Sequence, residues 1–392
     1  MTTQFPVDDD ALCALAVALA QTSSVSGTEG EAVALVTGAM QAAGFDEVGV
    51  DDSGNAVGVL GPADRPTLMI DGHIDSIPLH SAERWSVDPF GGMVRDGMLY
   101  GLGICDQKAS IAAAIWGVAV AAPVAASRVV VVASVCEEEM EGGALAEPVA
   151  TWRPDAFVTS EPNDTQLCIG QRGRAKVEVT VTGRACHAGH AGYGLNAALA
   201  VAALIDEAAR ITHPAHPQLG ARDLNCIDVH SDPYPSVSTI PGSAVARFDC
   251  RFIPGETEES VVALLVDAAR RAWAGWPEQP GLEVKLVEAT FATWTGRTFS
   301  LPEYAAAWWT PEDSALVRAA TGALGTVGLD PTPTHYSFCT NGSYSAGVCG
   351  IPTIGFGVGV ESMAHQVDEH VSLKSLRRGA QGYAALAAMA LR

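Results

Sequence analysis

The chain has 392 residues, a length that indicates a globular protein with two domains. Hydrophobic residues make up 48% of it and the mean hydropathy is +0.18, so a sizeable core can be buried. With 45 acidic and 23 basic side chains, the formal net charge is −22. A negative charge of this size disfavours nucleic acid and anionic membranes, and we expect neither as a partner.

The nine cysteines lie at wide spacings without a Cys-x-x-Cys pair, which predicts free thiols in a reducing cytoplasm. Near the N-terminus, Asp8, Asp9 and Asp10 precede an apolar stretch at 11–20. A secretory signal would carry positive charge there, and the stretch is too short to span a bilayer. We therefore expect a first helix capped by an aspartate.

Helical and strand patterns then alternate. The helical patterns lie at 29–43 and 110–121, and the strand patterns at 67–71, 128–135 and 156–160. The segment 128–135 contains four consecutive valines, as expected of a strand buried on both faces. This alternation predicts a mostly parallel sheet with helices on both sides.

The pattern changes near residue 175. Apolar and polar residues alternate strictly from 176 to 182, which predicts a half-exposed strand. The segments that follow are a helix, two strands, a helix and a strand, at 196–210, 226–230, 244–252, 258–273 and 282–287. The order β-α-β-β-α-β is that of a ferredoxin-like α+β unit.

After residue 291 the first pattern returns, with a helix at 314–324 and a strand at 352–356. The fold class we expect is α/β, with a doubly wound, mixed but mostly parallel sheet. One domain would comprise 1–174 and 292–392, and the ferredoxin-like domain would be inserted at 175–291.

Histidines and carboxylates follow the ends of several predicted strands. In chain order they are His73, Asp75, Asp106, Glu137, Glu138, Glu139, Glu161 and His365. In open α/β sheets, sites form at the carboxyl ends of the strands. Because imidazole and carboxylate are the ligands of zinc and similar divalent ions, the set predicts a metal site.

Each motif alone has a plainer interpretation. A single His-x-Asp is more often a hydrogen-bonded pair than a metal ligand, and three glutamates are usually a solvated face. Here the glutamates close a buried strand, where three like charges require neutralisation. The Gly101-x-Gly103 loop lacks the third glycine of a nucleotide-binding loop, so we expect no nucleotide.

Together the motifs resemble the dinuclear zinc metallopeptidase and deacylase family of acetylornithine deacetylase, succinyl-diaminopimelate desuccinylase, carboxypeptidase G and the aminoacylases. The matching segments span essentially the whole chain, at 72–78, 100–106, 135–142, 161–162, 183–196 and 337–365. The resemblance implies hydrolysis of a linear amide bond, in an N-acyl amino acid or small peptide, by metal-activated water. It implies two divalent ions, zinc before cobalt or manganese, and a small amino-acid-derived substrate.

The resemblance also assigns the metal ligands. Asp106 would bridge the two ions. His73 and Glu161 would complete the coordination of one ion, and Glu138 and His365 that of the other.

The catalytic roles follow from the same resemblance. Glu137 would be the general base, and Asp75 would orient His73 from behind. The family pattern leaves Glu139 without a role, and a register shifted by one residue along the triplet is the alternative. The peptide bond between Asp106 and Gln107 is expected to be cis.

Four more residues match or border family positions near the substrate. His187 matches a lid histidine that, in the family, reaches the neighbouring subunit's site and binds the oxyanion. This match implies a homodimer formed through the inserted domain. The alternative is that His187 is a surface histidine. Arg251 matches an arginine that binds a substrate carboxylate, and the alternative is an ion pair with Asp249. Ser238 and Glu361 stand where desuccinylase-like relatives carry asparagine, which makes succinyl-diaminopimelate a less expected substrate.

Two rival functions remain. A cysteine hydrolase could use Cys186 and His187, although adjacent residues on a strand point to opposite faces. A binding or assembly protein could have kept the fold without catalysis.

Overall fold

The computed structural model describes residues 3–391, which fold into two compact units. Unit 1 runs to Gln171 and also takes in Thr290–Ser300 and the chain from Trp308 onward. Unit 2 comprises Arg172–Ala289 and Leu301–Ala307. The sequence predicts one insertion at 175–291, whereas the observed unit 2 has a second, short segment.

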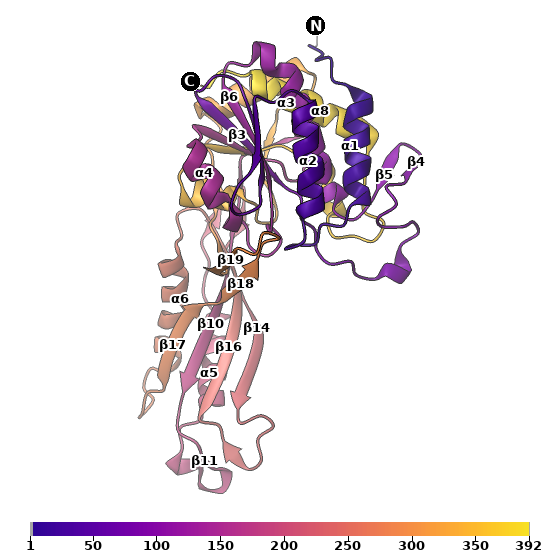
Figure 1. Ribbon diagram of the computed structural model, residues 1–392. Helices are drawn as coiled ribbons and strands as arrows, with labels where there is room; N and C mark the ends of the chain where they lie inside the picture. The colour runs from indigo at the N-terminus through magenta and orange to yellow at the C-terminus, as the bar shows by residue number, and fades with distance from the viewer. Residues whose placement is uncertain (1–2, 392) are drawn as a thin grey trace. The chain divides into compact units, whose positions relative to one another are not determined.

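Unit 1 is built on an eight-stranded sheet (Figure 1). Its strands, in spatial order, are β1 (Glu47–Val50), β2 (Ala56–Leu60), β6 (Arg128–Ser134), β3 (Thr67–His73), β7 (Ala156–Thr159), β23 (Thr353–Gly355), β8 (Leu167–Cys168) and β22 (Pro333–Thr334). The four central strands, from β6 to β23, are mutually parallel. The edge pairs β1–β2 and β2–β6 are antiparallel, so the sheet is mixed but mostly parallel at its centre, as predicted.

Helices cover this sheet. They are α1 (Asp9–Gln21), α2 (Gly30–Ala42), α3 (Ala109–Ala121), α4 (Ala146–Trp152), α7 (Ala315–Thr326) and α8 (Leu373–Ala388). In Figure 1, α1, α2, α3 and α8 lie on one side of β3 and β6, and α4 lies on the other. Asp8 caps α1 by accepting a hydrogen bond from the backbone N–H of Ala11, as predicted.

The most apolar stretch of the chain is a core element of unit 1. Residues Ile104–Val124 are long and apolar enough to cross a membrane by length and composition, and 67% of that stretch is buried inside the fold. Alanine-rich α3 packs between the sheet and α8. Its burial against these elements accounts for its composition.

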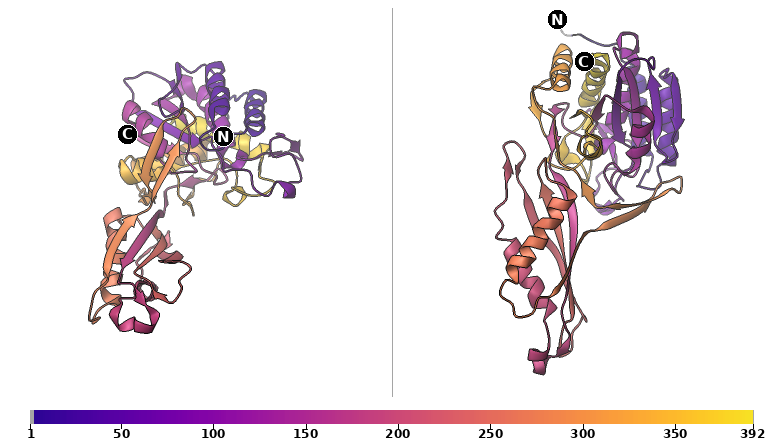
Figure 2. Two further views of the ribbon diagram at one scale, coloured as in Figure 1. Left: turned by 60° about the horizontal axis from the view of Figure 1, so that its bottom comes forward. Right: turned by 90° about the vertical axis from the view of Figure 1, so that its left-hand side faces the viewer.

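Unit 2 is an antiparallel sheet with two helices, as the sequence predicts; four main strands form it, and the short β20 (Tyr304–Ala305) pairs with β10 as a fifth. Its main elements are β10 (Gly173–Thr182), α5 (Ala197–Ala208), β14 (Asp223–Asp232), β16 (Ser243–Phe252), α6 (Glu258–Ala272) and β17 (Gly281–Leu286). The spatial order is β14-β16-β10-β17. Buried and half-exposed residues alternate along β10, and the apolar face packs on α5 and α6 (Figure 2).

Candidate metal centre

The predicted site residues of unit 1 do lie at strand ends. His73 is the last residue of β3, Glu137 and Glu138 follow β6, and Glu161 follows β7. Since these strands are parallel neighbours, their carboxyl ends meet at one edge of the sheet. The arrangement brings together side chains that are far apart in the sequence.

Asp106 lies between the two histidines. Its Oδ1 is 3.1 Å from His73 Nε2, and its Oδ2 is 3.5 Å from His365 Nε2. His365 Nε2 is also 2.9 Å from Glu138 Oε1. Each oxygen of one carboxylate therefore faces a different imidazole, which is the arrangement that a bridging ligand requires.

The potential ligand atoms form two groups, and inside each group all atoms lie within 4.8 Å of one another. They are His73, Asp106 and Glu138 in one group, and His73, Glu137 and Glu161 in the other. Glu137 Oε2 is 3.9 Å from His73 Nε2, so the predicted base also lies beside this histidine, although farther from it than Asp106 Oδ1 at 3.1 Å. The peptide bond between Asp106 and Gln107 is cis, as predicted.

The cluster buries more carboxylates than its two histidines can neutralise, and the pKa values of its side chains reflect this. Burial, and then the charge of Glu161, raises the pKa of Glu137 well above its usual range. Burial, and then Asp106, does the same to the pKa of Glu161. For His73, burial acts to lower the pKa, but hydrogen bonds to Asp106 and Asp75 raise it well above its usual range.

Buried oxygens in the cluster have no protein partner. Glu137 Oε1 and Glu161 Oε1 are both buried without a hydrogen bond among the described residues. Buried carboxylates need a cation or a donor. Two divalent ions would supply the missing charge, and carboxylate and imidazole are suitable ligands, so the residues present fit such a pair.

The carboxylate of Asp75 holds two parts of the site. His73 Nδ1 is 3.1 Å from the Asp75 backbone oxygen and 3.5 Å from the carboxylate Oδ1. The carboxylate also accepts hydrogen bonds from the backbone N–H groups of Glu137 and Glu138, both at 3.1 Å. Asp75 thus fixes the loop that carries the predicted base, a contact that the sequence does not predict.

Other supporting residues were also missed. Glu29 accepts a hydrogen bond from the backbone N–H of Cys136, and Asn341 donates to the buried Asp71 and accepts from Gly142 N–H. A Cβ on Gly72, next to His73, would lie 2.7 Å from Gln107 Oε1 and 2.9 Å from Ile111 Cδ1, so a larger residue would displace both side chains. The one sequence signal for Glu29 is its position as an acid at the start of the helix α2; its burial is seen only in the structure.

The comparisons with known proteins agree with this geometry. The family model described as Peptidase family M20/M25/M40 matches residues 69–389. The chain belongs to this family. It is therefore a hydrolase of amide bonds.

Individual relatives are distant but cover the chain well. The chain is 29% identical to the uncharacterized protein YgeY of Escherichia coli K12, over 88% of this chain and 86% of that one. It is 29% identical to succinyl-diaminopimelate desuccinylase of Phenylobacterium zucineum, over 83% of each chain. The structure of YXEP from Bacillus subtilis, described as a dinuclear metal binding peptidase from the M20 family, matches with a TM-score of 0.71 and 15% identity, over 97% of each chain.

In this M20 family member, His187 lies on an exposed loop of unit 2. The short strand β11 (Cys186–His187) pairs with β15 (Thr239–Ile240), and Ser238 accepts a hydrogen bond from Ala188 N–H. The structure therefore places Ser238 beside His187. His187 Nδ1 accepts from the backbone N–H of Gly189 at 3.1 Å, which leaves Nε2 to carry the proton of the neutral ring.

The other candidate residues, Arg251, Glu361 and Cys186, make contacts of their own. Arg251 Nε donates to Asp249 at 2.8 Å, which is the alternative that the sequence left open. Glu361 is half-buried in unit 1, and burial raises its pKa. The thiol of Cys186 donates to the carbonyl oxygen of His190 while His187 bonds Gly189, so the two make no nucleophile–base hydrogen bond.

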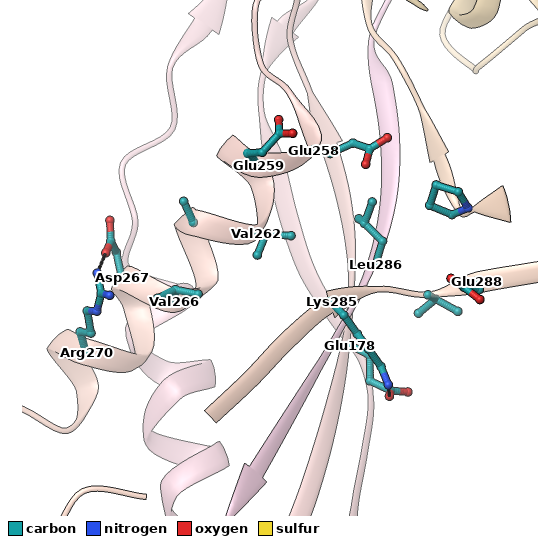
Figure 3. A pocket seen from close by; sticks show the side chains of 13 residues that line it. Glu178, Glu258, Glu259, Val262, Val266, Asp267, Arg270, Lys285, Leu286 and Glu288 are labelled. Carbon is teal, nitrogen blue, oxygen red and sulfur yellow. Dashed lines mark hydrogen bonds and ion pairs between the residues drawn. The ribbon is translucent and has the colours of Figure 1, made fainter. Parts of the chain in front are cut away.

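A wide groove lies elsewhere, between α6 and β17 of unit 2 (Figure 3). Its volume is about 1040 Å³. Val262 and Val266 of α6 form its apolar wall, with Glu258 at one end and the Asp267–Arg270 ion pair at the other. No residue of the metal cluster lines it, so groove size does not locate the chemistry here.

Proposed function

We propose that the protein is a two-metal amidohydrolase that cleaves a linear amide of an N-acyl amino acid or small peptide. One observation supports this most strongly. The two oxygens of buried Asp106 face His73 and His365, and Glu138 and Glu161 lie beside these groups. Such a set is suited to a pair of cations about 3.5–4 Å apart.

The division of these residues between two ions follows the family resemblance. His73 and Glu161 would hold one, Glu138 and His365 the other, and Asp106 both. Two ions bound there would acidify a water molecule and stabilise negative charge on oxygen. Zinc is the ion that this ligand set favours, with cobalt or manganese as alternatives.

Glu137 would move the protons. It would accept a proton from the attacking water and return it to the amide nitrogen as the carbon–nitrogen bond breaks. Its buried Oε1 has no other partner and Asp75 fixes its backbone, so it is held ready for this transfer. The positive charge of bound cations would keep it ionised against the effect of burial.

His187 would stabilise the oxyanion with a hydrogen bond from Nε2, the nitrogen that its contact with Gly189 leaves protonated. As the family resemblance implies, we propose that it acts on the neighbouring subunit of a homodimer formed through unit 2. Exposed apolar side chains on one flank of this unit support such contact. They are Ile227 and Val229 of the edge strand β14 and Leu199 of α5, each more than half exposed.

A mixing experiment tests the shared site. Glu137→Gln and His187→Ala chains are each expected to be nearly inactive alone. If His187 acts across the interface, mixed dimers contain one site with both intact groups, and activity returns. If subunits are shown to exchange and the mixture still has no activity, the proposal of a site shared between subunits is wrong.

Arg251, Ser238 and Glu361 are the candidates for substrate contact, and the last two argue against succinyl-diaminopimelate. A panel of N-acetyl, N-succinyl and N-carbamoyl amino acids and dipeptides, assayed with metal-free and metal-loaded protein, tests the function. Turnover should require metal.

The same panel separates the rivals. A cysteine hydrolase would retain activity without metal and lose it on substitution of Cys186. A binding protein would take up two ions per chain and hydrolyse nothing. The missing thiol–imidazole hydrogen bond disfavours the first, and the complete ligand set disfavours the second.

A further inference from the structure

The loop that carries Asp106 is held by a buried acid from a distant part of the chain. Glu369 is 1% exposed. Its Oε1 accepts hydrogen bonds from the backbone N–H groups of Cys105 at 2.7 Å and Asp106 at 3.1 Å. Its Oε2 accepts from Gly103 N–H at 2.8 Å, so both carboxylate oxygens bind this one loop.

This contact replaces regular secondary structure. The backbone of Asp106 and Gln107 has non-helical φ and ψ angles between Gly103 and α3. The amides of Cys105 and Asp106 are buried, and an unpaired buried amide is costly. Glu369 satisfies three such amides with one side chain, and thereby fixes the direction in which the Asp106 carboxylate points.

Strand pairing brings Glu369 to this position. β24 (His370–Ser372) pairs with β5 (Met98–Tyr100), and His370 stands opposite Tyr100. Glu369 therefore lies opposite Gly101, whose N–H bonds the Glu369 backbone oxygen at 3.1 Å. The buried ammonium of Lys108, which donates to Thr22 and Leu102 carbonyl oxygens, is near enough to interact with the charge of Glu369.

The same segment carries His365. Four residues after this histidine, the chain reaches Glu369 and anchors the Asp106 loop. We infer that Glu369 is a positioning residue that sets Asp106 against His365 and so prepares the shared ligand for two ions. This inference rests on the proposed function, because it concerns the same metal pair.

The test compares metal binding by Glu369→Ala, Glu369→Gln and the unchanged protein. Competition with a chromophoric chelator gives the affinities, and the visible absorption of bound Co²⁺ reports the ligand arrangement. Loss of an outer contact to a metal ligand typically weakens binding about 10–100-fold. We expect a loss in this range for Glu369→Ala, with an altered Co²⁺ spectrum.

Glu369→Gln should show a smaller loss, since its single oxygen can still accept from Cys105 and Asp106. The matched control is Asp368→Asn. The neighbouring carboxylate of Asp368 accepts the exposed N–H of Ser86, at 2.7 Å, and contacts no proposed metal ligand among the described residues, so metal binding should be unchanged.

Two outcomes would overturn the inference. If both Glu369 variants bind two ions with unchanged affinity and spectrum and lose only thermal stability, Glu369 is an ordinary core residue. If the unchanged protein itself binds no metal pair, the proposed function fails and the inference with it. Should Glu369→Ala not fold, the Gln variant decides between the first outcome and the inference.

Discussion

Unit 1 and unit 2 present their candidate residues in opposite ways. In unit 1, His73, Asp106 and Glu137 are buried and held by neighbours that bind their backbone or ring. In unit 2, His187 is exposed on a loop and Arg251 is paired with Asp249. The difference teaches that only the metal cluster is preorganised within one unit. Under the proposed function, His187 would act only when a partner subunit brings its site to it.

Removal of metal should have the largest effect. Because the proposed reaction depends on two ions, treatment with a chelator should abolish turnover, and added Zn²⁺ or Co²⁺ should restore it. Metal should also raise the unfolding temperature of unit 1 more than that of unit 2, since only the native cluster binds it. Turnover that persists in verified metal-free protein would contradict the proposal.

Glu137→Gln should come next. General base catalysis typically contributes 10²–10⁴-fold, so kcat should fall by about that factor. The metal content should stay at the level of the unchanged protein, because the base is not a proposed ligand. Glu139→Gln is the control, since Glu139 is exposed and has no proposed role. If Glu137→Gln stayed active and Glu139→Gln lost metal instead, the triplet would have been assigned one residue out of register.

His187→Ala should lower kcat about 10²–10³-fold, the usual loss for one oxyanion donor, without changing metal content. His190→Ala, on the same exposed loop, serves as the control and should remain active. An effect of equal size in both variants would mean that the loop matters only as a whole. An unchanged kcat in His187→Ala would leave unit 2 without a part in the chemistry.

A smaller effect concerns stability in unit 1. Burial, partly offset by hydrogen bonds from Asn341 and Ser134, raises the pKa of Asp71 from 3.8 to about 6. The folded state therefore holds this proton more tightly than the unfolded state. Its contribution to stability is complete below pH 4 and is lost as the pH rises through about 6. The full change is roughly 3 kcal/mol.

Urea unfolding of the metal-free Asp71→Asn variant and of the metal-free unchanged protein, compared at several pH values, measures the contribution of Asp71 to stability. The stability of the unchanged protein relative to the variant should decrease between pH 4 and pH 7. A difference that is constant over this range would show that Asp71 titrates normally.

The sequence predicts the strands and their ends well, for a physical reason. The valine run of β6 is buried on both faces, and the residues that follow it fall at the edge of the sheet. Local patterns of this kind place His73, Glu138 and Glu161. The family resemblance then distinguishes base from ligands, which spacing alone does not.

Other features leave no local pattern. The sequence predicts no helix near the C-terminus, because Gly379 and Gly382 interrupt the helical pattern there. The structure nevertheless has α8 at this place. In the structure these glycines make room for Val358 and Phe356. Glu369 joins the Asp106 loop across 263 residues by side-chain contacts to backbone amides, and such contacts have no periodicity to read.

Diffraction at the zinc absorption edge, from crystals grown with excess Zn²⁺, tests the central claim most directly. The account predicts two anomalous peaks, one beside His73 and Glu161 and one beside Glu138 and His365, with Asp106 touching both. An ordered cluster with no peak, or with a single peak that leaves one of the histidines without a metal, would contradict it.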